Sequence, residues 1–84
     1  MKQTIDRINR APVGAPFGVT SSSEGLTAVD SESAVRKFNA EVVPLIHELE
    51  AQGQLEIRRI RRESFTGDRL ISAMIVVRRT DEQL

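Results

Sequence analysis

The sequence has no cysteine, tryptophan or tyrosine, and it has a single histidine. Without cysteine the chain cannot form a disulfide, a thiolate metal site or a cysteine nucleophile. One histidine and scattered carboxylates are a poor ligand supply for a zinc ion. No apolar run approaches the roughly 20 residues of a membrane span, and the first residues lack the apolar stretch of a secretion signal. We therefore expect a cytoplasmic protein that has no cofactor, no metal ion and no enzymatic activity.

The composition changes near residue 30. The 84 residues, 39% of them hydrophobic and 29% charged, suit one small globular domain. Residues 11–25 hold two of the three prolines, three of the five glycines and a triple serine, which is typical of a loop. We expect a short helix and this loop over 1–29, a structured domain over 30–80 and a tail over 81–84. Within the loop, residues 16–20 can extend as an edge strand.

An amphipathic helix is predicted over residues 30–53. Asp30 or Ser31 can cap its first turn, and Gly53 can end it in a left-handed conformation. Pro44 lacks an N–H group, so either one helix of about 22 residues is kinked there or two shorter helices meet just before it. The apolar stripe has spacings of three and four without a break, which favours one helix. Its members are Val35, Phe38, Val42, Leu45, Ile46 and Leu49.

A β-hairpin is predicted after the helix. Residues 54–64 and 69–79 are rich in Ile, Val, Leu and Arg and flank a short turn sequence. A three-residue loop at 65–67 pairs Ile57 with Ile75. The sheet face toward the helix then holds Leu55, Ile57, Ile71, Ala73, Ile75 and Val77. The expected fold is α+β, with one long helix packed on an antiparallel hairpin and a third strand from residues 16–20.

The opposite face of this hairpin carries four aliphatic side chains, Ile60, Leu70, Met74 and Val76. A helix and two strands bury only one layer, so a covering surface would add stability. We predict that a second copy of the chain covers these four residues, and the alternative is the N-terminal segment of the same chain. The first hypothesis for function is a small protein-binding or assembly module that acts as a homodimer, with another protein as a further partner.

Arginine is concentrated in the hairpin. Residues 54–80 carry seven arginines against three acidic residues, a net charge of +4, whereas residues 24–50 have a net charge of −4. Clustered arginine is typical of binding to nucleic-acid phosphates, although no tyrosine or tryptophan is present to stack on bases. The alternative is that the arginines pair with the acidic helix or protect an edge strand from aggregation. The candidate binding residues are Arg58, Arg59, Arg61, Arg62, Arg69 and Arg78.

The run VVPLIHELEAQGQLEIRR, from Val42 to Arg59, resembles the recognition helix and first wing strand of winged-helix DNA-binding domains. In that family a helix commonly ends in Leu-Glu-x-x-Gly and is followed by an apolar residue and arginines. The resemblance covers about residues 40–79. It implies a winged helix as the alternative fold and a nucleic-acid-binding regulator as the alternative function. It places Glu41, Pro44, His47 and Glu48 toward a DNA groove, and Arg61, Arg62 and Arg69 on the wing.

Overall fold

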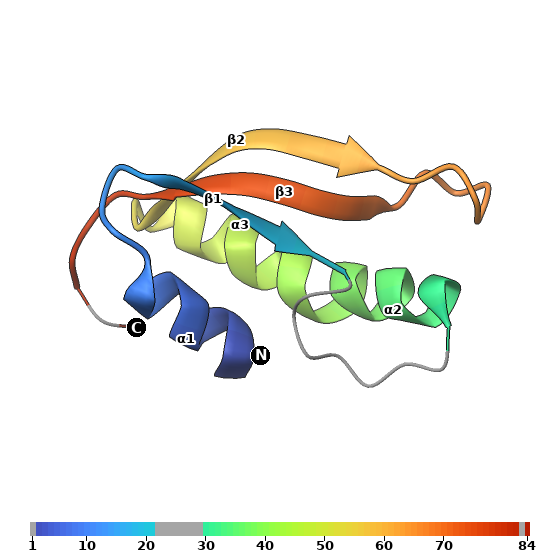
Figure 1. Ribbon diagram of the computed structural model, residues 1–84, viewed down its shortest axis with the longest axis horizontal. Coiled ribbons are helices and arrows are strands. Elements are labelled where there is room, and N and C mark those ends of the chain that lie inside the picture. The colour runs from blue at the N-terminus through green and yellow to red at the C-terminus, as the bar shows by residue number, and fades with distance from the viewer. Residues whose placement is uncertain (1, 22–29, 83) are drawn as a thin grey trace.

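The computed structural model describes residues 2–21, 30–82 and 84. Its elements are α1 (Lys2–Arg10), β1 (Pro16–Thr20), α2 (Ser31–Lys37), the π-helical turn η1 (Phe38–Val42), α3 (Val43–Ala51), β2 (Leu55–Arg62) and β3 (Ile71–Arg78). The strands form an antiparallel sheet in the order β1-β3-β2. The labelled helices all lie on one side of this sheet (Figure 1). The predicted α+β fold is confirmed, together with the third strand at residues 16–20.

The two ends of the long helix are capped as predicted. The Asp30 carboxylate accepts a hydrogen bond of 2.7 Å from the Ser33 backbone N–H. Hydrogen bonds from Ser33 favour the charged carboxylate and hold the pKa of Asp30 below its ordinary value. At the other end, Gly53 has a φ of +78°, which glycine adopts without a steric penalty. Local sequence signals therefore define where this helix begins and ends.

The helix continues past Pro44 through a widened turn. α2, η1 and α3 follow one another without a gap from Ser31 to Ala51, which confirms one helix rather than two. Pro44 cannot donate a hydrogen bond, and in a regular α-helix its ring would crowd the carbonyl of residue 40. Just before it, the Val43 N–H bonds to the Phe38 carbonyl, five residues back. This π turn opens the helix where the proline needs space.

The hydrophobic core lies between the helices and the sheet. It contains residues from before and after the compositional change near residue 30, since Ile8 of α1 and Val19 of β1 are buried in it. The N-terminal segment is thus packed into the same core as the long helix and the hairpin. The core cluster consists of Ile8, Val19, Phe38, Val42, Val43, Ile46, Leu49, Leu55, Ile71, Met74 and Val76.

The predicted pairing of β2 with β3 is wrong by one residue at Ile57 and by two residues from Arg59 to Arg61. Ile57 pairs with Val76 rather than with Ile75, and the register shifts again between Ile57 and Arg59. The connection between the strands runs over residues 63–70 instead of being a three-residue loop. Gly67 has a positive φ as expected, but it belongs to this longer loop. Because neighbouring residues of a strand point to opposite faces, a slip of one residue exchanges the two faces of β3.

The helix-facing side of β3 therefore carries Met74 and Val76, which are 1% and 0% exposed. The prediction that these two residues lie on the outer face is wrong. Ala73 and Ile75, which we expected beneath the helix, point to the outer face, where Ile75 is 36% exposed. The chain's own helices cover Met74 and Val76, two of the four apolar side chains that the prediction left for a second copy.

Candidate functional site

The face of the sheet opposite the helices is the candidate site, and we call it the open face. No helix or strand formed by residues 2–21, 30–82 or 84 lies on that side (Figure 1). Residues directly opposite each other in antiparallel strands point to the same face. The register therefore defines two rows across this face. One row holds Gly18, Ile75 and Arg59, and the next holds Thr20, Ala73 and Arg61.

Arg59 and Arg61 end these rows on the edge strand β2. Both side chains are exposed. Within the described part of the chain, no hydrogen bond or ion pair ties either guanidinium to another residue. The two arginines are two residues apart, about 6.6 Å along a strand with a rise of about 3.3 Å per residue. Two guanidinium groups thus lie side by side and are available to a ligand.

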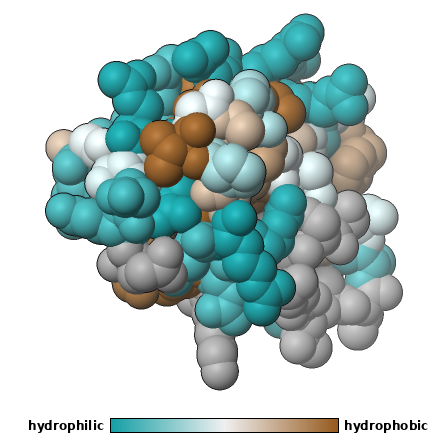
Figure 2. Space-filling model, turned by 60° about the vertical axis from the view of Figure 1, so that its left-hand side comes forward, coloured by the Kyte–Doolittle hydropathy of each residue, from teal (hydrophilic) through white to brown (hydrophobic). Residues whose placement is uncertain are grey.

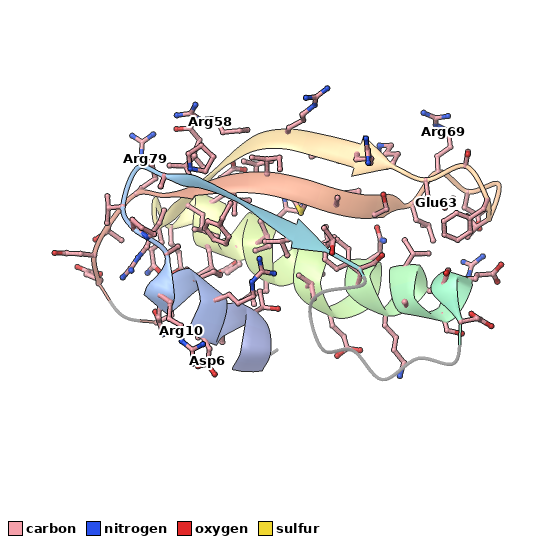
Figure 3. All side chains as sticks on the ribbon, in the orientation of Figure 1. Asp6, Arg10, Arg58, Glu63, Arg69 and Arg79 are labelled. Atoms are coloured by element: carbon pink, nitrogen blue, oxygen red, sulfur yellow. The ribbon has the colours of Figure 1, made fainter. Side chains whose placement is uncertain are left out.

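A second group of charges lies at the far end of the open face. The Glu56 carboxylate forms ion pairs with both Arg58 and Arg79. Figure 3 shows Arg58 and Arg79 extending from the sheet away from the helices, on the same side as Arg69. In Figure 2, hydrophilic side chains project along this upper side of the molecule, with a small hydrophobic patch between them. Because Glu56 neutralises part of the local charge, Arg58 and Arg79 attract an anion less strongly than Arg59 and Arg61 do.

Glu63 organises the loop that joins β2 to β3. Its carboxylate accepts hydrogen bonds of 3.0 Å from the backbone N–H groups of Thr66 and Leu70, and a further one from the Thr66 hydroxyl. Burial raises the pKa of Glu63, but the hydrogen bonds from Thr66, Leu70 and Phe65 outweigh burial and lower the pKa below its ordinary value. The charged carboxylate therefore replaces the tight turn that the sequence pattern predicts.

This loop presents Arg69 on the open side of the sheet (Figure 3). Arg69 has a φ of +52°, the one positive φ outside glycine among the described residues. Its carbonyl accepts a 2.9 Å hydrogen bond from the Arg62 guanidinium. Asp68, its neighbour, pairs with Arg36 of α2 at 3.1 Å. The contacts of the Arg69 carbonyl and of the Asp68 side chain hold this uncommon backbone conformation.

The prediction that Arg78 belongs to the binding surface is wrong. Arg78 is 5% exposed and points to the helix side. Its guanidinium donates to the carbonyls of Asn9 at 2.8 Å, Ala11 at 3.1 Å and Glu82 at 2.9 Å. It therefore satisfies carbonyls near the C-terminal end of α1, where the helix dipole favours a cation. Arg78 joins α1 and the tail to β3.

The surface predicted for a second copy is incomplete. Met74 and Val76 are buried in the core, whereas Ile60 is 40% exposed and Leu70 is half-buried. Because Met74 and Val76 lie in the core, a partner could reach only two of the four aliphatic side chains, Ile60 and Leu70. Two of the four residues predicted for the homodimer interface are therefore not accessible to a partner.

A hollow of about 310 Å³ lies on the open face next to the two arginines. Ala73 leaves it open, because only a methyl group stands between the side chains of Thr20 and Arg61. Ile75 adds an apolar wall. The residues that line the hollow are Thr20, Arg59, Arg61, Ala73, Met74 and Ile75.

Asn39 supports the start of β3 and was missed by the sequence analysis. Its side-chain amide donates to the carbonyls of Val35 and Ile71, each at 2.7 Å, and its oxygen accepts from the Ile71 N–H at 3.1 Å. The amide thus pairs with the Ile71 backbone as a neighbouring strand would. The available sequence signal was a polar amide beside Phe38, on the edge of the apolar stripe.

The structure describes residues 2–21, 30–82 and 84. No group of three or more His, Asp or Glu residues lies close enough there to hold a metal ion. None of its helices has the length and apolar character needed to cross a bilayer. No protein-family model, curated protein or solved structure shows significant similarity to this chain.

Proposed function

We propose that this protein binds nucleic acid through the phosphate backbone, with the open face of the sheet as the contact surface. The observation that carries the proposal is the pair Arg59 and Arg61, which are exposed, adjacent and without an ion-pair partner among the described residues. Arginine matches phosphate oxygens with two parallel hydrogen bonds. Each neutralised phosphate also releases counterions, which favours binding at low salt. Arg69, held by its loop, extends the same positive surface.

The open face suits this role better than the exposed face of the long helix. The winged-helix resemblance assigns Glu41, Pro44, His47 and Glu48 to a DNA groove, and all four are exposed. Two of them are carboxylates, which repel phosphates and cannot donate hydrogen bonds to them. We therefore place the nucleic acid on the sheet rather than on α3.

Assembly into a homodimer is the competing function. The burial of Met74 and Val76 removes apolar area that a dimer would use. We therefore expect the free protein to sediment as a monomer of 9.4 kDa. A dimer that persists across concentrations and at high salt would favour the assembly function instead.

The test is a binding titration with fluorescently labelled DNA, followed by anisotropy at several salt concentrations. We expect the double variant Arg59→Glu, Arg61→Glu to lose binding at low salt. In Arg59→Gln, Arg61→Gln, the slope of log K against log salt should become shallower by roughly 1.4 to 1.8, since each lost phosphate contact contributes about 0.7 to 0.9.

The matched control is Arg10→Glu, which reverses a charge on the helix side (Figure 3). Arg10 is exposed on α1, so this variant should bind like the wild type. Circular dichroism establishes that each variant is folded. Equal binding by the control and the double variant, or wild-type binding that does not change with salt, would refute the proposal.

A further inference from the structure

We infer that the open face binds single-stranded nucleic acid in preference to duplex, and that its hollow receives one unstacked base. The inference rests on the proposed function, since it assigns the class of nucleic acid that the same arginines bind. Its basis is the hollow of about 310 Å³ directly between the arginine edge and β1. A flat positive surface would contact phosphates alone, whereas a hollow beside the arginines offers space for a base as well.

The hollow has the chemistry of a base site. Its floor and one wall are apolar, formed by Ala73 and Ile75, and its outer wall is formed by Arg59 and Arg61. A guanidinium plane can stack on a base as an aromatic ring does, so this surface can hold a base although the chain has no tyrosine or tryptophan. The volume of about 310 Å³ lies at the lower end of the range of roughly 300–1,000 Å³ found for small-ligand sites, which suits one planar base.

The surroundings of the hollow keep it open. Gly18 carries no side chain, and a Cβ there would lie 3.8 Å from Cδ1 of Ile75, an ordinary contact distance. Cδ1 of Ile75 therefore lies on the Gly18 side of Ile75, next to the space that a Cβ at Gly18 would occupy. The small residue at position 73 leaves the remaining depth. Ala73 thus gives the hollow its depth, while the arginines supply the charge.

A base inside a duplex is stacked and paired and cannot enter this hollow. Duplex DNA would contact the arginines through phosphates only, whereas a single strand adds the contact between one base and the hollow. One stacked base contributes enough to change affinity by about tenfold. We therefore expect a single strand to bind about tenfold more tightly than a duplex of the same length at equal salt.

The experiment fills the hollow without changing charge. Ala73→Leu places a larger apolar side chain on its floor, and Ala51→Leu makes the same change at an exposed position at the end of α3. The probes are a labelled oligothymidylate, its duplex with oligoadenylate, and an abasic strand with the same number of phosphates. For Ala73→Leu we expect about a tenfold loss on the oligothymidylate and no more than a twofold change on the duplex. Ala51→Leu should match the wild type on all three probes.

The abasic strand tests the inference on the wild-type protein, even if Ala73→Leu does not fold. We expect it to bind like the duplex, because it offers phosphates without bases. If the oligothymidylate, the duplex and the abasic strand bind equally, or if Ala73→Leu keeps full affinity for the oligothymidylate, the base site is refuted and the phosphate surface stands. If none of the three binds, the proposed function fails as well.

Discussion

Replacing Asn39 by alanine tests whether one amide side chain holds the start of the central strand. The substitution removes one hydrogen bond of 2.7 Å to the Val35 carbonyl within the helix and two, of 2.7 and 3.1 Å, that join the helix to the Ile71 backbone. A typical hydrogen bond contributes about 1 kcal/mol, and an unpaired buried group costs about 1–3 kcal/mol. The better helix propensity of alanine returns roughly half a kcal/mol. We therefore expect Asn39→Ala to lower the free energy of unfolding by about 2–3 kcal/mol.

This loss is large for a chain of 84 residues, because a domain of this size is stable by only about 4–12 kcal/mol. Urea denaturation followed by far-ultraviolet circular dichroism is the suitable assay, since the chain has no tryptophan or tyrosine for fluorescence. The midpoint should fall while the slope of the transition stays constant. Amide hydrogen exchange should show reduced protection at Ile71.

The matched control is Asn9→Ala, which removes one hydrogen bond from the Leu84 N–H at 2.8 Å. We expect it to cost less than about 1 kcal/mol, because it joins only the tail to α1. If Asn39→Ala costs about half a kcal/mol or less, or if Asn9→Ala costs as much, the role assigned to Asn39 is wrong.

Two further predictions concern charged residues in the helix-side core and the loop. Arg78→Met should destabilise the fold by about 2–4 kcal/mol, because its three carbonyl partners lose a charged donor. Arg79→Met, at an exposed position, should change the urea midpoint little. Equal losses of stability in the two variants would contradict the role assigned to Arg78. The lowered pKa of Glu63 predicts that its stabilising effect is complete above its unfolded pKa of about 4.3 and disappears as the pH falls through the folded pKa. Urea midpoints between pH 7 and pH 3 should therefore converge for wild type and Glu63→Gln at low pH, and curves that stay parallel would show that the carboxylate's charge does not stabilise the loop.

The long helix could be predicted because its determinants are local. The spacing of the apolar residues, the cap at Asp30 and the stop at Gly53 all act within a few residues of the positions that they define. The π turn could not be predicted, since a proline within an apolar stripe indicates that the helix is disturbed but not which change of hydrogen bonding accommodates the proline. Pro44 is accommodated by the bond from Val43 to Phe38, which depends on the packing of the whole helix against the sheet.

The faces of the hairpin could not be predicted because they depend on the length of one loop. Glu63 bonds to backbone groups as far away as Leu70, and this side chain made the connection longer than the turn pattern suggests. The one-residue error that followed placed Met74 and Val76 on the wrong face. Errors of this kind affect every residue of a strand at once.

The exposure of the candidate arginines could be predicted for most of them but not for Arg78. The concentration of arginine in the hairpin is evident from composition, and Arg59, Arg61 and Arg69 are indeed exposed. Arg78 points inward because it lies on the same face of β3 as Met74 and Val76. The hollow had no sequence signal, since it arises from the way the register aligns Thr20, Ala73 and Arg61 across three strands.

The strand order β1-β3-β2 has a consequence for the synthesis of this chain. β3, the strand that pairs with both others, leaves the ribosome after them, so neither β1 nor β2 has a partner until residues 71–78 have emerged. The sheet must then form at once from segments that are up to about sixty residues apart, and pairing over such distances is slow because the loops between the strands must close first. Before that moment the arginines of β2 would oppose the association of this unpaired strand with other nascent chains, because charged side chains disfavour edge-to-edge pairing. The arginines that we assign to phosphate binding would then limit aggregation during synthesis, before the folded protein uses them to bind phosphate.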